Sequence, residues 1–186
     1  MTIDLEWASA FIDVANVPAE GARWRIAAGN PAREAVAQRL QVDALETFEA
    51  IFDLKPLAGG GLRAKGKIDA SLVRVCVVTD APFVEQVSDS FFFRILDDDA
   101  TLAANPHPDD PDMEFAEDGK IDLSELAIQH LSVSMAAYPR GPEADREMAE
   151  IEADKGHSDG KDGPESSPFS ALAARLGSVS ERKEGK

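Results

Sequence analysis

A single cysteine and three histidines are the side chains of this sequence that could serve as nucleophile, general base or soft metal ligand. Cys76 lies in the valine-rich run 73–78 with no histidine close to it in sequence. It is therefore predicted to be a buried thiol that packs as a small apolar residue. His130 falls on the apolar face of a predicted helix, a position typical of a core histidine rather than of a ligand or base. One thiol can form neither an internal disulfide nor a multi-cysteine zinc site, so no metal site is predicted. Because Cys76 and His130 are both expected to be structural, no catalytic residue is predicted either.

Residues 118–125 match the second half of a calcium-binding EF-hand loop, with glycine at its sixth position and glutamate at its twelfth. The first half does not match, because its third position would be Ala116, whose side chain has no oxygen to donate. A capped helix start explains the same residues, and a calcium-responsive module is the alternative. The glycines at 59–61 lack the lysine and the helix of a phosphate-binding loop. No cofactor is expected, and the chain is not expected to be an enzyme.

Basic side chains recur on one predicted strand. Arg63, Lys65 and Lys67 alternate with apolar residues and so project from one side of it. Arg74 follows where the apolar phase flips at Val73, Val75 and Val77, as a β-bulge or a strand newly buried on both faces would require. These four cations are the candidate nucleic-acid-binding residues, because such groups contact RNA phosphates. The alternative is a solvent face or sheet edge that is protected by charge.

The net charge of −16 is distributed unevenly along the 186 residues. Residues 1–96 carry −3, residues 97–166 carry −15 and residues 167–186 carry +2. The acidity therefore belongs to a middle block and a linker, and nonspecific binding to RNA or membranes is not expected. No apolar run approaches the roughly 20 residues of a membrane span. The first eleven residues carry no basic side chain and so do not resemble a secretory signal, and the expected location is the cytoplasm.

The elements that position these residues follow from apolar periodicity. A period of two predicts strands at 3–14, 24–26, 48–54, 62–77 and 83–95. The last three are long and joined by short turns, which favours an antiparallel β-meander. One helix is predicted to begin at Asn30-Pro31, with asparagine as N-cap, and a second at Asp122, which forms a capping box with Glu125. The predicted fold is a single α+β domain over residues 1–142, an antiparallel sheet flanked by two or three helices.

Two segments of this chain lack the apolar content of a core. Residues 97–118 contain an Asp-Asp-Asp run and three prolines, and are predicted to form a long acidic loop. Residues 143–166 are charged, rich in glycine and serine and nearly free of large apolar groups. They are predicted to form a disordered acidic linker.

The C-terminal segment carries one further signal. A short helix is predicted over residues 167–178, and a disordered tail over residues 179–186. Phe169, Leu172 and Leu176 form its apolar stripe and are the candidate partner-binding residues. A helix of about ten residues is marginal in water, so it is expected to form only in a groove, either on a partner or on its own domain.

Several short motifs, taken in order, resemble the YceD family of bacterial and plastid proteins, which is associated with accumulation of large-subunit ribosomal RNA. The motifs are GKIDA at 66–70, CVVTDAPF at 76–83, IDLSEL at 121–126 and SPFSALAARL at 167–176. The resemblance implies a non-enzymatic factor that supports rRNA accumulation and ribosome assembly by binding rRNA or an rRNA–protein intermediate. The alternative is an adaptor that binds a basic ribosomal protein through the acidic loop and the C-terminal helix, without RNA contact.

The sequence departs from the family pattern in its cysteines. Many members have Cys-x-x-Cys where this chain has Cys76 and Thr79, and a second cysteine pair after the late helix; here residues 138–145 contain none. The chain therefore resembles a cysteine-poor branch that would not hold structural zinc. The turn at Cys76 is expected to be held by packing and hydrogen bonds alone.

Overall fold

The computed structural model describes residues 2–58, 60–97 and 112–158. The chain divides into two compact units, residues 1–142 and residues 143–186. In the first unit, six strands form one sheet in the order β1-β3-β4-β5-β6-β7. They are β1 (Thr2–Glu6), β3 (Ala22–Ala27), β4 (Ala44–Pro56), β5 (Leu62–Val75), β6 (Pro82–Asp97) and β7 (Asp112–Ala116). The remaining elements are two short 3-10 helices (Trp7–Ser9 and Val14–Asn16), the paired strands β2 (Phe11–Asp13) and β8 (Lys120–Asp122), and the helices α1 (Asn30–Leu40) and α2 (Leu123–Ser134).

The α+β class is confirmed, but the sheet is mixed rather than an antiparallel meander. The consecutive strands β4, β5 and β6 pair antiparallel, whereas β1 pairs parallel to β3 and β6 pairs parallel to β7. A parallel neighbour needs a connection of about a dozen residues or more. The intervals between β1 and β3 (residues 7–21) and between β6 and β7 (residues 98–111) meet that length. The meander prediction is therefore wrong at both edges, where strand pairing depends on contacts that periodicity does not encode.

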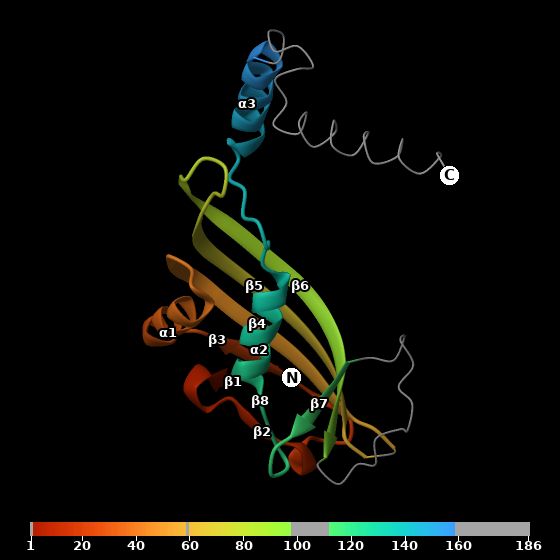
Figure 1. Cartoon of the computed structure of the whole chain (residues 1–186). Helices are drawn as coiled ribbons and strands as arrows, with labels where there is room; N and C mark the ends of the chain where they lie inside the picture. Colours follow the sequence, from red (N-terminus) through yellow and green to blue (C-terminus); the bar gives the residue numbers. More distant parts are fainter. Residues whose placement is uncertain (1, 59, 98–111, 159–186) are drawn as a thin grey trace, which may run out of the picture. The chain divides into compact units, whose positions relative to one another are not determined.

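One face of this sheet is covered by helices. In Figure 1, α2 runs across β5 and β6, and α1 lies beside β4; the same pairs of elements are in contact. The inward residues of the strands, such as Phe52 and Phe93, join Leu126 and Leu131 of α2 in one buried cluster. Burial of this kind stabilises a fold by about 25 cal/mol per Å² of apolar surface. The opposite face of β3, β4, β5 and β6 carries mainly polar side chains, together with the apolar Ile51 and Phe92.

Both predicted helix starts are present. The N-cap of α1 is Gly29 instead of Asn30, and a proline stands in its first turn. Asp122 caps α2 as predicted, since its carboxylate accepts hydrogen bonds from the backbone N–H groups of Ser124 (2.9 Å) and Glu125 (3.2 Å). The Glu125 carboxylate instead takes a bidentate pair from Arg39 of α1, at 2.6 Å for both bonds. Glu125, the acid of the predicted capping box, therefore links α2 to α1.

Two segments predicted to lack regular structure contain elements. Residues 112–116 of the predicted acidic loop form β7, and in the second unit α3 (Ala144–Ser158) occupies most of the predicted disordered linker. Within α3, Arg146 pairs with Glu143 at 2.8 Å and with Glu150 at 3.9 Å. Such pairs and the helix propensity of alanine, glutamate and methionine favour a helix without a broad apolar face. The linker prediction considered charge, glycine and serine content and the lack of apolar groups over the whole segment, and not the helix propensity of its first part. The predicted helix 167–178 with Phe169, Leu172 and Leu176, and the tail 179–186, lie outside the described residues.

Candidate nucleic-acid interface

Three of the four predicted cations lie together on the open face of the sheet. Alternation along β5 buries Ala64, Gly66 and Ile68, and it exposes Arg63, Lys65 and Lys67 on the side away from α1 and α2. The strand register then adds neighbours that the sequence analysis did not single out. Arg63 pairs with Lys55 of β4 and Arg94 of β6, and Lys65 pairs with Asp53 and Phe92. Only strand pairing reveals these additions, because they lie far from Arg63 in sequence.

The acidic side chains of this face form ion pairs with cations other than Arg63 and Lys65. Asp53 receives two hydrogen bonds from Arg23 of β3, at 2.7 and 2.9 Å, and Asp69 pairs with Lys67 at 2.7 Å. Arg25 likewise pairs with Glu49. Among the residues that the structure describes, Lys55, Arg63, Lys65 and Arg94 have no ion-pair partner. The open face is therefore neutralised over β3 and positive where β4, β5 and β6 meet near the β4–β5 turn.

The centre of this positive area is a row of like charges. Lys55, Arg63 and Arg94 are direct cross-strand neighbours on three adjacent strands, and all three are exposed. Directly opposed residues have Cβ atoms about 5 Å apart, and like charges at that distance destabilise the pairing. A bound polyanion would remove this repulsion. We call Lys55, Arg63, Lys65 and Arg94 the cationic patch.

Arg74 does not belong to this patch. The pairing of β5 with β6 is unbroken from Leu62 to Val75, so β5 has no β-bulge against β6 and Arg74 faces the helix side. The register irregularity lies in β4 instead, between Leu45 and Thr47. Arg74 donates to Glu85 and to the backbone carbonyl of Ala136, both at 2.7 Å, and its side chain is 16% exposed. It therefore joins the sheet to the end of α2.

Cys76 is fully buried, as predicted. Its sulfur accepts hydrogen bonds from the Thr79 side chain and from the backbone N–H groups of Gly141, Val78 and Thr79, which together lower the pKa of the thiol to about 7 despite its burial. The backbone N–H of Val77 also donates to the carbonyl of Pro139 at 2.9 Å. The two turns are thus joined by hydrogen bonds around a thiol that solvent does not reach.

His130 lies in the core region that its helical position predicts. Its ring stacks on Phe91 of β6, with ring centroids 3.5 Å apart and planes inclined by 7°. Burial lowers the pKa of His130, although the carboxylates of Asp112 and Asp89 oppose the shift. The neutral ring packs against an aromatic neighbour, and its contacts account for the position without a ligand.

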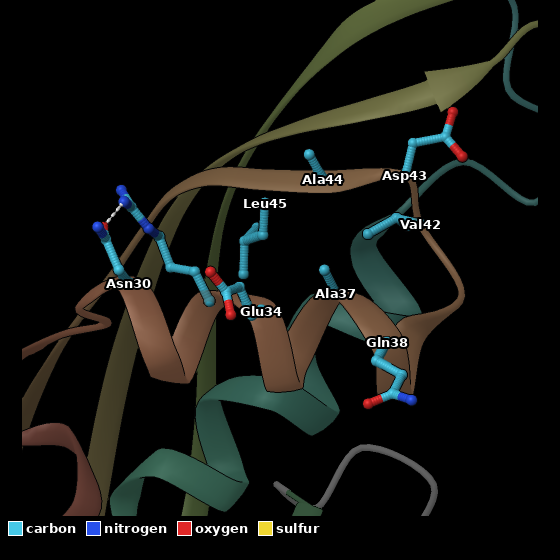
Figure 2. Close-up of a pocket in the computed structure, with 9 residues that line it drawn as sticks. Asn30, Glu34, Ala37, Gln38, Val42, Asp43, Ala44 and Leu45 are labelled. Atoms are coloured by element: carbon cyan, nitrogen blue, oxygen red, sulfur yellow. Dashed lines mark hydrogen bonds between the residues drawn. The ribbon is translucent and has the colours of Figure 1, made fainter.

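Among the described residues, the hollow beside α1 brings together no cluster of catalytic side chains. A hollow of about 480 Å³ lies between α1 and the start of β4, and Figure 2 shows Asn30, Glu34, Gln38 and Asp43 spread around its rim. The guanidinium of Arg33 is engaged by Asn30 and by the carbonyl of Glu46. Within residues 2–58, 60–97 and 112–158, no three histidine, cysteine or acidic side chains are placed to hold a metal ion.

A second hollow of about 440 Å³ lies around β7, β8 and α2. Its apolar lining includes Phe11 and Phe115, which are 57% and 42% exposed. Its acidic lining comprises Glu114, Glu117, Asp118, Asp122 and Glu125. Burial and then the neighbouring Asp112 raise the pKa of Glu114. This acidic hollow has the opposite charge to the cationic patch and contains the residues of the partial EF-hand match.

No family model, curated protein or solved structure matches this chain. Among the described helices, none is both long enough and apolar enough to span a bilayer.

Proposed function

We propose that this chain is a non-enzymatic cytoplasmic factor that supports accumulation and stability of large-subunit ribosomal RNA and ribosome assembly. It would act by binding rRNA, or an rRNA–protein intermediate, through the open face of its sheet. The observation that carries the proposal is the row of Lys55, Arg63 and Arg94, which has no acidic partner among the described residues. The resemblance of the ordered motifs to the YceD family supplies the class of RNA.

The charge distribution supports a local contact. Lysine and arginine side chains that neutralise phosphates release counterions, and each such contact makes the affinity more dependent on salt. The net charge of −16 opposes nonspecific binding of RNA to the chain. Contacts to phosphates position a protein on RNA but carry no sequence information by themselves. The cationic patch would therefore provide affinity.

In-cell UV crosslinking of the tagged full chain, followed by sequencing of the bound RNA, tests this proposal. We expect enrichment of discrete large-subunit rRNA segments, and loss of that enrichment when Arg63, Lys65 and Lys67 are all replaced by glutamate. Arg140→Glu reverses a single charge at an exposed arginine outside the sheet and is the matched control for the single variant Arg63→Glu. Unchanged crosslinks and unchanged ribosome profiles in the triple variant would refute the proposal.

A second candidate function is an adaptor that binds a basic ribosomal protein. The acidic hollow favours it, because five carboxylates surround an apolar lining with two exposed phenylalanines. Such a surface is complementary to a basic segment with apolar side chains. Mass spectrometry of co-purified proteins separates the two candidates: ribosomal proteins recovered without crosslinked rRNA, and lost on Glu114→Lys, would favour the adaptor.

A further inference from the structure

An exposed aromatic ring stands within the cationic patch. Phe92 is 42% exposed and projects from β6 on the open face, directly opposite Lys65 and two residues before Arg94. Phe91 and Phe93, its neighbours in sequence, point to the other face and pack in the core region. Phe92 therefore contributes little to the buried core.

The ring of Phe92 borders two surface hollows. The first, of about 230 Å³, is lined by Leu57, Ala58, Arg63, Phe92 and Arg94. The second, of about 370 Å³, is lined by Ile51, Asp53, Lys65, Gly66, Lys67, Ser90, Phe91 and Phe92. In both hollows an apolar surface lies beside cationic side chains. The aromatic group is accessible and has cations on both sides of it.

We propose that Phe92 stacks on an unpaired base of single-stranded RNA, and that the base enters the hollow flanked by the guanidinium groups of Arg63 and Arg94. The adjacent phosphates would then contact Lys55 and Lys65. This inference rests on the proposed function, because it names the form of RNA that the open face takes. Bases stack on aromatic rings and on guanidinium planes when they are free of a duplex.

The chemistry of the surface favours single-stranded RNA over other ligands. A duplex presents phosphates to a cationic surface but keeps its base faces stacked inside the helix, so it would contact the cations and leave Phe92 unused. An apolar peptide would cover Phe92 but would leave the repulsion between Lys55, Arg63 and Arg94 in place. A single strand supplies both the negative charge of its phosphates and the flat apolar faces of its bases. It is the ligand that satisfies the ring and the cations together.

The binding test uses the purified full chain with a fluorescent twelve-nucleotide single strand and with a blunt-ended duplex that has no unpaired base, compared at equal phosphate concentration and one fixed salt concentration. Base–aromatic stacking predicts that Phe92→Leu weakens binding of the single strand by roughly 5- to 150-fold and leaves binding of the duplex unchanged. The matched control is Phe115→Leu, since Phe115 is also 42% exposed but lines the acidic hollow. This control should bind both RNAs as the parent chain does.

A second variant reports the contact directly. Phe92→Trp retains a stacking surface, so it should keep the affinity for the single strand, and the single strand should quench its added tryptophan fluorescence. Equal affinity of Phe92→Leu and the parent chain, together with no quenching in Phe92→Trp, would overturn the inference. If Arg63→Glu and Arg94→Glu weakened binding in that same experiment, the proposed function would stand without the stacking contact. If the parent chain bound neither RNA, both would fail.

Discussion

The ion pair between Arg74 and Glu85 separates a structural arginine from the arginines of the cationic patch. Replacing Arg74 by methionine keeps much of the side-chain volume but removes two charge-assisted hydrogen bonds, to Glu85 and to the carbonyl of Ala136, both of 2.7 Å. The Glu85 side chain is 13% exposed, so its carboxylate would be left poorly solvated with only the N–H of Ala136, at 2.9 Å, as a partner.

Breaking a buried pair by removing one partner costs about 3 to 5 kcal/mol. Because some solvent reaches both side chains, we expect the lower end, and Arg74→Met should reduce the free energy of unfolding of the first unit by about 3 kcal/mol. Arg63→Met, at an exposed position without an ion pair among the described residues, should change it by less than about 0.5 kcal/mol.

Urea unfolding of the full chain, followed by the fluorescence of its two tryptophans, of which Trp24 is buried, measures both effects. The affinity for RNA should show the reverse order. Arg63→Met should weaken binding of RNA, and Arg74→Met should leave it unchanged under conditions in which that variant remains folded. The double variant Arg74→Met/Glu85→Leu should recover part of the lost stability, because it leaves no unpaired carboxylate. A loss below about 1 kcal/mol for Arg74→Met, or equal effects of the two single variants, would refute the structural assignment.

Three further predictions concern the interior of the first unit. Burial lowers the pKa of His130 below its unfolded value of 6.5. The contribution of the neutral ring to stability should therefore be fully present above pH 6.5 and be lost as the pH falls through the folded pKa. His130→Phe should remove this pH dependence from a series of urea midpoints. A Cβ at Gly66 would overlap the ring of Phe91, which stacks on His130. Gly66→Ala should therefore lower the free energy of unfolding by about 1 to 3 kcal/mol. An unchanged melting temperature would contradict this packing. The Cys76 thiol should react with a disulfide reagent only on unfolding, because it is fully buried. Fast labelling of the native chain would disprove the burial.

Local sequence signals predicted the features that depend on near neighbours. The capping side chain of Asp122, the start of α1 near its proline and the three long strands follow from residue types within a few positions of one another. The same signals failed where composition was used as a substitute for structure. Residues 144–158 have little apolar content and nevertheless form α3, because helix propensity and the ion pair between Arg146 and Glu150 act within the segment itself.

The sequence by itself determined that Arg63, Lys65 and Lys67 share one side of a strand, since the side chains of a strand alternate. Only the tertiary structure decided which cations lack an acidic partner among the described residues. Asp53 is directly opposite Lys65 in the register but pairs with Arg23, which lies 30 residues away in sequence. Strand pairing also brought Lys55 and Arg94 beside Arg63, and unbroken pairing sent Arg74 to the other face. Alternation is a property of one strand, whereas the charge of a surface depends on which strands lie side by side and in which register.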